Sequence, residues 1–253
     1  MEEEIHGGFY EIGAYRHNVR RYKEGIEQLN DIQSMLKERA DIESSYAKSL
    51  QTFHAKWSNY VSHLPHSTIK NVWTELLEEG SEVSKLHANV KDRISDELLK
   101  TISLYLKENH HPTAFRAPKE IREIEDDFEK AQRPWRKHYE KAEKAKKAFH
   151  LASKAERSAE IQAKNASGDS SISTDNENKF RERYQKCQGE LAKSEKAYRV
   201  AINDLISLKA NYISHMEDVY ENCQQKELKR LKFVFEMLCG FQKVVVDVAT
   251  ATK

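Results

Sequence analysis

One stretch decides the fold of this 253-residue chain: EIGAYRHNVRRYKEGIEQLNDIQSML, from Glu11 to Leu36. Its apolar residues recur every three or four positions, which is the period of an α-helix that turns one face toward a core. They are Ile12, Tyr15, Val19, Tyr22, Ile26, Leu29, Ile32 and Leu36. Strict alternation of apolar and polar residues, which marks a half-buried strand, is missing from the stretch. It therefore predicts a long amphipathic helix.

The same period continues along the rest of the chain and is broken at three places. Pro65 ends the first stripe, the loop HHPTAFRAP (His110–Pro118) ends the second, and the polar run ASGDSSISTD (Ala166–Asp175) ends the third. The pattern predicts four helices, at about residues 10–64, 67–109, 118–165 and 175–248. Pro134 lies inside the third of them and predicts a kink there. The polar run at 166–175 is expected to be a mobile loop.

Helices of this length set the architecture. A helix of about 65 residues spans roughly 100 Å, whereas a compact domain of this chain length is only about 45 Å across. The chain is therefore expected to be an elongated all-α antiparallel bundle with long, kinked helices. The core of such a bundle is thin, so a second copy in a two-fold dimer is expected to cover the apolar stripes. A monomeric spectrin-like bundle is the alternative.

Composition limits the classes of function. Charged residues make up 33% of the chain, with only 8 Gly and 4 Pro, as is typical of long helices. Three cysteines without metal-ligand spacing fit a reduced, cytoplasmic protein. The N-terminus MEEEIHGGFYEIG is acidic and has no apolar signal region, and the densest apolar run, Val244–Val246, is too short to span a bilayer. Any contact with a membrane is therefore expected to be peripheral.

Catalytic and cofactor-binding patterns are missing from the sequence. There is no Gly-rich phosphate loop and no nucleophile elbow, and only Glu108 with His111 has the Glu-x-x-His spacing of a helical metal site. We expect no enzymatic activity, no metal and no cofactor. Nucleic acid is not an expected partner either, because a groove-reading motif is missing and the pI is only about 7.7.

The third predicted helix carries an uneven charge. Between Lys130 and Arg157 there are ten basic and three acidic residues. Such a stretch is either a surface for an anionic partner or a solvated face in which Glu140 pairs with Lys144 and Glu143 with Lys147. The loop before this helix carries Phe115, so the two together indicate a partner that is both anionic and apolar, as a phospholipid bilayer is. Packing of Phe115 on its own chain, or against a neighbouring dimer, is the alternative.

Three motifs resemble one family. ERADIESSYAKSL (Glu38–Leu50) is similar to the N-terminal core motif of F-BAR domains. FEKAQRPWRKHYEKAEKAKKAFHLA (Phe128–Ala152) and VYENCQQKELKRLKF (Val219–Phe233) resemble the syndapin (pacsin) branch. The resemblance covers essentially the whole chain, so residues 1–253 are identified as a single F-BAR domain of the syndapin type.

The resemblance implies a banana-shaped antiparallel homodimer whose concave basic face binds anionic phospholipid, such as phosphatidylserine and phosphoinositides. It implies a wedge loop at 110–118 that inserts Ala114 and Phe115 into the bilayer, with Arg116 placed to pair with lipid phosphate. It also places Lys56 at a basic family position. Together with the third helix, the expected lipid-binding residues are Lys56, Lys130, Arg133, Arg136, Lys137, Lys141, Lys144, Lys146 and Lys147.

Syndapins carry an SH3 domain that recruits dynamin and actin-nucleation regulators, and no such segment follows here, so we expect a C-terminally truncated domain. The function that the resemblance implies is sensing and generation of membrane curvature in endocytosis, at the plasma membrane and endocytic membranes. The alternative is a dimeric coiled-coil scaffold whose basic face binds an acidic protein or actin.

Overall fold

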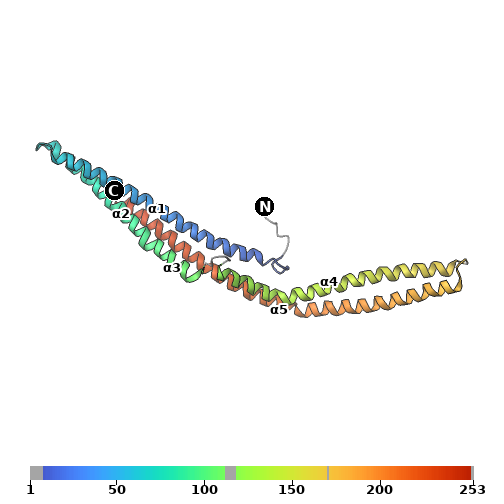
Figure 1. Ribbon diagram of the computed structural model, residues 1–253. Helices are drawn as coiled ribbons and strands as arrows, with labels where there is room; N and C mark the ends of the chain where they lie inside the picture. The colour runs from blue at the N-terminus through green and yellow to red at the C-terminus, as the bar shows by residue number, and fades with distance from the viewer. Residues whose placement is uncertain (1–7, 112–117, 170, 252–253) are drawn as a thin grey trace. The chain divides into compact units, whose positions relative to one another are not determined.

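The computed structural model describes residues 8–111, 118–169 and 171–251 (Figure 1). Helices joined by short turns make up this described part of the chain, which confirms the all-α prediction. The order is α1 (Arg16–Ser62), α2 (Thr68–Arg93), the π-helical turn η1 (Ile94–Leu99), α3 (Lys100–Asn109), α4 (Lys119–Gly168) and α5 (Thr174–Ala251). No helix in the described ranges is both long and apolar enough to cross a membrane.

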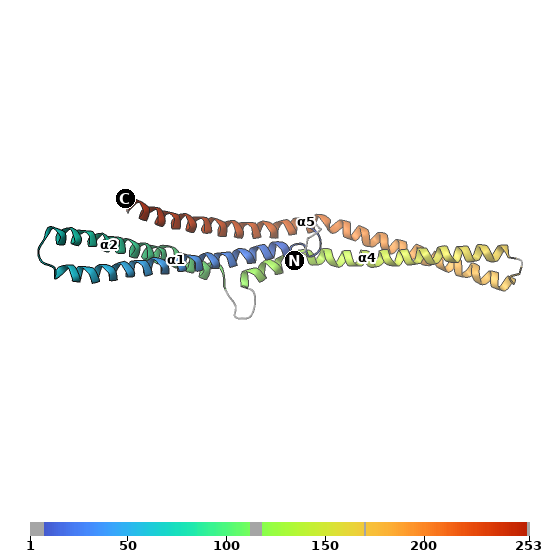
Figure 2. The ribbon, with the colours of Figure 1, turned by 90° about the horizontal axis from the view of Figure 1, so that it is seen from above.

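The chain divides into two compact units, each with its own core. One, here called the hairpin unit, comprises Met1–Tyr15 and Asp126–Glu221. In it, α4 and α5 lie side by side (Figures 1 and 2). The other, here called the three-helix unit, comprises Arg16–Glu125 and Asn222–Lys253. In it, α1 and α2 run side by side and are joined by the turn that contains Pro65.

The core of the three-helix unit is assembled from α1, from the run of α2, η1 and α3, and from the last third of α5. Its fully buried side chains include Leu36 of α1, Ile94 and Ile102 of the middle run, and Val244 of α5. Each helix therefore contributes one stripe, as expected for amphipathic helices.

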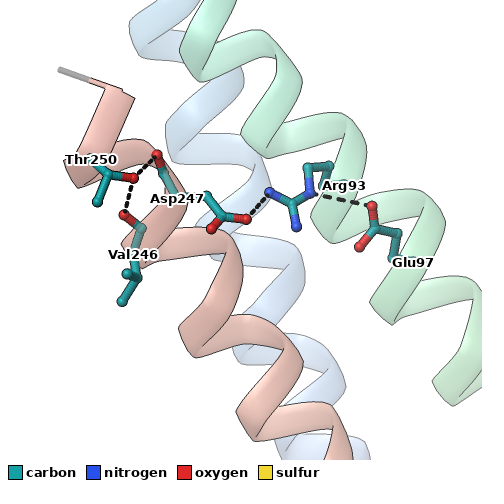
Figure 3. Close-up of polar contacts among 5 residues, drawn as sticks. All are labelled: Arg93, Glu97, Val246, Asp247 and Thr250. Atoms are coloured by element: carbon teal, nitrogen blue, oxygen red, sulfur yellow. Dashed lines mark hydrogen bonds and ion pairs between the residues drawn. The ribbon is translucent and has the colours of Figure 1, made fainter.

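Polar and aromatic contacts fix α5 to this unit. Arg93 Nη1 donates to Asp247 Oδ2 at 2.8 Å and Arg93 Nε donates to Glu97 at 3.3 Å, so one guanidinium joins α2 to α5 (Figure 3). Further along, the rings of Tyr105 and Phe233 stack with centroids 3.8 Å apart.

The beginning of the first helix differs from the prediction. We expected it near residue 10, but α1 begins at Arg16. Residues 8–14 form turns, with hydrogen bonds from Glu11 N to Gly8 O and from Ala14 N to Glu11 O. Gly13 has a φ of +89°, which lies outside the right-handed helical region. The apolar period runs through this segment, but the conformation of Gly13 is not helical, so the helix begins only after it.

The other boundaries differ in smaller ways. The helix expected at 67–109 contains the π-helical turn η1. Gly240 of α5 lies close to this turn, since a Cβ placed on it would be 3.0 Å from Leu98 Cδ2. α4 continues through Pro134 and reaches Gly168, while α5 already begins at Thr174. The loop expected at 166–175 is therefore shorter, because Ala166 is still helical and buried.

Gly25 marks a second close approach, between α1 and α5. Arg230 is only 4% exposed and lies over Gly25, held by hydrogen bonds from its Nε and Nη2 to Glu227 at 2.9 and 2.6 Å. A Cβ on Gly25 would lie 2.6 Å from both the Cζ and the Nε of Arg230. The guanidinium could move aside only by leaving Glu227, and a buried charge without its partner is costly.

We predict opposite effects for two glycine substitutions in helices. Gly25→Ala should lower the free energy of unfolding by about 1–3 kcal/mol, because it overpacks the contact with Arg230. Gly189→Ala, at an α5 position with no atom within 4 Å of the new Cβ, should raise it by about 0.5–1 kcal/mol. Urea denaturation measures both. Equal effects of the two substitutions would contradict the packing of Arg230 on Gly25.

Candidate functional site

The predicted basic residues of the third helix lie on α4, and most of them form one row. Lys130, Arg133, Lys137, Lys141 and Lys144 are separated by three or four residues, so they follow one side of the helix, and Lys147 extends the row by three more. All six side chains are exposed. The structure therefore brings six of the predicted lipid-binding residues onto one side of one helix.

Ion pairs divide this row into neutralised and free cations. Lys141 Nζ donates to Asp204 on α5 at 2.9 Å, and Lys130 Nζ lies 3.3 Å from Asp127. The hydrogen bond from Lys141 holds the pKa of Asp204 below its ordinary value. Lys137, Lys144 and Lys147, in contrast, have no ion-pair partner among the residues that the structure describes. These three carry most of the uncompensated charge of the row.

Two predicted residues of α4 stand apart from the row. Arg136 is half-buried and forms a charged hydrogen bond with Glu129, which lowers the pKa of that carboxyl. Lys146 is nine residues from Lys137, about two and a half turns, so it lies on the opposite side of the helix. It is paired with Glu143 at 3.7 Å. Within one chain, Lys146 therefore does not belong to the row that contains Lys137.

The side of α4 opposite the basic row packs against α5. Ala142 and Ala159 are buried there, and Trp135 stacks on Tyr212 with ring centroids 4.9 Å apart and planes 5° apart. Small residues allow the two backbones to come close, and the aromatic pair adds about 0.5–1.5 kcal/mol beyond its buried area. Trp135 is therefore a packing residue, and the basic row is held on a fixed helix rather than on a loop.

A buried glutamine fixes the N-terminal segment to the same hairpin unit. Gln132 is fully buried; its Oε1 accepts from Gly13 N at 2.8 Å, and its Nε2 donates to Glu11 O at 3.2 Å and to the Tyr212 hydroxyl at 2.9 Å. The Tyr212 hydroxyl donates in turn to Tyr10 O at 2.8 Å. Each buried polar atom of this network has a partner, so the segment before α1 is locked to α4 and α5.

Lys56 belongs to the three-helix unit. It is exposed on α1, and its Nζ lies 5.3 Å from the centre of the Trp57 ring, as in a cation–π contact. Trp57 itself stacks on Trp73 of α2 with centroids 6.2 Å apart. The aromatic pair ties the ends of α1 and α2 together beside the lysine.

Comparison with known proteins agrees with this geometry. Residues 15–89 match the family described as "Fes/CIP4, and EFC/F-BAR homology domain". The solved F-BAR domain of Drosophila syndapin is 38% identical, with a TM-score of 0.83, over 94% of this chain and 83% of that one. The chain belongs to the syndapin family of F-BAR domains.

Curated relatives lead to the same family. Protein kinase C and casein kinase substrate in neurons protein 1 of Danio rerio is 34% identical over 94% of this chain and 54% of its own length. Protein 2 of that name from Gallus gallus is 34% identical over 93% and 53%. This F-BAR domain thus spans about half the length of the curated relatives it matches. Membership of the family favours membrane binding and curvature over the protein-scaffold alternative.

The tip of the expected wedge loop, with Ala114, Phe115 and Arg116, lies outside the described residues of this F-BAR domain. The residues that flank the loop are described. His111 Nδ1 lies 2.5 Å from Glu120 Oε1, and His111 N donates to Glu120 Oε2 at 3.0 Å. Burial acts to raise the pKa of Glu120, but these hydrogen bonds outweigh it and leave the pKa below its ordinary value. The two sides of the loop base are therefore joined.

His110, beside this pair, is buried against two tyrosine rings. It is 6% exposed, its ring meets the edges of Tyr22 and Tyr105, and neither ring nitrogen has a hydrogen-bond partner in the described part of the chain. Burial lowers its pKa. Glu120 opposes that shift, while Arg230, His111 and Lys229 reinforce it. His110 is thus held neutral.

This burial predicts a loss of stability in mild acid. Because the pKa of His110 is lower in the folded chain than in the unfolded one, the unfolded chain takes up more protons as the pH falls through about 6.5. The free energy of unfolding should therefore decrease from pH 7.5 to 5.5, by at most about 1.4 kcal/mol per pH unit for this group. His110→Phe should reduce that slope. Urea denaturation across this pH range provides the measurement.

Two comparisons distinguish the effect of His110 on stability from the effects of other titratable groups. The pKa values of Glu43 and Glu120 are also lowered, but carboxylates lose their contribution only below about pH 4.5. His215→Phe, at an exposed position of α5, is the matched control, and His110→Phe should lower the slope more than this control does. An unchanged slope in His110→Phe would show that this histidine does not titrate between the folded and unfolded states as described.

Proposed function

We propose that this chain, over residues 1–253, works as a single membrane-binding and membrane-curving F-BAR domain. The observation that carries the proposal is the basic row on α4, with Lys137, Lys144 and Lys147 exposed and unpaired within the described residues. The ligand is the anionic leaflet of a bilayer, rich in phosphatidylserine or phosphoinositides. The site of action is the cytoplasmic side of the plasma membrane and of endocytic membranes.

The charge of the row is sufficient for reversible binding. Near an anionic leaflet, each Lys or Arg contributes about 1 kcal/mol, and the attraction falls off over a Debye length of about 8 Å at physiological salt. Three unpaired lysines on each of two protomers would supply about 6 kcal/mol, which is a dissociation constant in the range of tens of micromolar. Because the lysines lie on one side of a rigid helix, they can contact the anionic leaflet at the same time.

A homodimer belongs to the same proposal. The three-helix unit leaves apolar stripes exposed on several helices: Met35, Ile42, Tyr46, Phe53 and Tyr60 on α1, Ile69, Val72 and Leu76 on α2, and Leu228, Leu231, Phe235 and Leu238 on α5. Apolar side chains in continuous rows of this length mark an interface. We propose that a second copy covers them, and that the two basic rows then act on one membrane.

The wedge loop and the partners of a longer protein complete the proposal. Ala114, Phe115 and Arg116 are proposed to enter the bilayer from the loop whose base is clamped by His111 and Glu120. An SH3 domain in a full-length protein would bring dynamin and actin-nucleation regulators to the same membrane. The basic row could also bind an acidic protein, and the experiment below separates that possibility.

The test is cosedimentation with phosphatidylserine vesicles, compared with neutral phosphatidylcholine vesicles. We expect wild type to bind the anionic vesicles only, and Lys144→Glu/Lys147→Glu to reduce the partition coefficient about a hundredfold or more, since two reversals change the charge of each protomer by four. Lys186→Glu/Lys193→Glu, with the same charge change on exposed positions of α5, is the control and should bind more strongly than the α4 variant.

Two outcomes would contradict the proposal. Wild type that stays in the supernatant with anionic vesicles would remove the membrane function. Equal losses in the α4 and α5 variants would mean that net charge matters and the row does not.

A further inference from the structure

The second half of α4 carries an exposed row of a different kind from the purely basic one. Going along the helix from Lys147, the residues Leu151, Lys154, Ser158 and Ile161 follow at steps of four and three, so all five share one side. Leu151 is 68% exposed and Ile161 is 52% exposed. Two large aliphatic side chains therefore lie in water between cations.

The same stretch is free of exposed negative charge. Between residues 144 and 165, all of which the structure describes, both Glu156 and Glu160 are half-buried, and Glu160 is paired with Lys164 at 2.7 Å. Arg157 adds another exposed cation beside the row. A second copy of this face would be repelled by like charge, and an acid-free, cationic and aliphatic face is instead complementary to an anionic, amphipathic partner.

A shallow hollow gives the row a defined place for a ligand. It is lined by Lys154, Arg157, Ser158, Ile161 and Gln162. Two cations, a hydroxyl and an amide around one aliphatic side chain suit a phosphate group joined to an apolar body. Long lysine and arginine side chains can extend toward phosphates while their stems lie along apolar groups.

We infer that this row is a second lipid contact, in which Lys154, Arg157 and Ser158 bind a phospholipid headgroup and Leu151 and Ile161 enter the interfacial region of the bilayer. The inference rests on the proposed function and extends it. It adds apolar anchorage on a rigid helix, apart from the loop at 110–118. Interfacial helices bind in this way, with cations at the headgroups and aliphatic side chains at the acyl boundary.

The two contributions should respond differently to salt. Attraction between the cations and the headgroups is screened as ionic strength rises, whereas burial of aliphatic surface is not. Binding of wild type should therefore fall with salt to a residual level, and that level should depend on Leu151 and Ile161.

The experiment compares vesicle binding of wild type, Leu151→Gln/Ile161→Gln and Val200→Gln/Ile206→Gln. The control pair removes two aliphatic side chains of similar exposure, 48% and 63%, from α5 of the same hairpin unit. With phosphatidylserine vesicles, the α4 variant should show a partition coefficient about tenfold lower or more, because each side chain is only partly buried at the interface. The α5 variant should match wild type. At about 0.5 M salt, where the Debye length is near 4 Å, only the α4 variant should show less residual binding than wild type.

The outcomes distinguish this inference from the proposed function. If wild type does not bind the vesicles, both fall. If wild type binds, Lys144→Glu/Lys147→Glu does not, and Leu151→Gln/Ile161→Gln binds as wild type does, the proposed function stands and the second lipid contact is overturned. Wild-type binding by the α4 glutamine variant with loss of vesicle tubules would assign the two side chains to contacts between neighbouring protein copies, which also overturns it. All exchanged residues are exposed, and circular dichroism verifies that the variants keep their helices.

Discussion

The structure depends on the limited surface that a pair or triplet of long helices can bury. Each helix of the three-helix unit turns one stripe inward, with Leu36, Ile94 and Val244 among the buried residues, and a second stripe stays in water. At about 25 cal/mol per Å² of apolar surface, those outer stripes represent a large unused stabilisation. A second copy of the same chain is the partner most directly suited to them. Dimerisation is in this view a requirement of the helix lengths.

A second constraint concerns the surface charge. A cation is available to an external ligand only where the fold leaves it without an ion-pair partner. Lys141 is paired with Asp204 and so joins α4 to α5, whereas Arg136 is paired with Glu129 on α4 itself. Lys137, Lys144 and Lys147 remain for an external anion. Leu151 and Ile161 continue the same helix with aliphatic groups. One helix thereby presents charge first and then charge mixed with apolar surface.

How much could be predicted from the sequence follows from the range of the forces involved. The apolar period is local, so the helices were predictable, as were the F-BAR motifs and the basic stretch. Contacts between residues far apart in the sequence were not predictable. No pattern near Gln132 predicts its hydrogen bonds to Gly13 and Tyr212, and the need for a glycine at position 25 is explained only by the packing of Arg230 on it. The expected start of the first helix was wrong because one glycine, Gly13, outweighed a continuous apolar stripe. Lys146 was predicted to bind lipid together with Lys137, although helical geometry places the two on opposite sides of α4.

The measurement that tests this account most directly is sedimentation velocity of the chain at micromolar concentration. We predict a species of twice the 29.5 kDa chain mass. Two isoleucines of equal 63% exposure then discriminate the interface: Ile42→Glu on α1 should dissociate the dimer, and Ile206→Glu on α5 of the hairpin unit should not. A wild-type chain that sediments as a monomer, or an Ile42→Glu variant that stays as dimeric as wild type, would contradict the claim that a second copy covers these stripes.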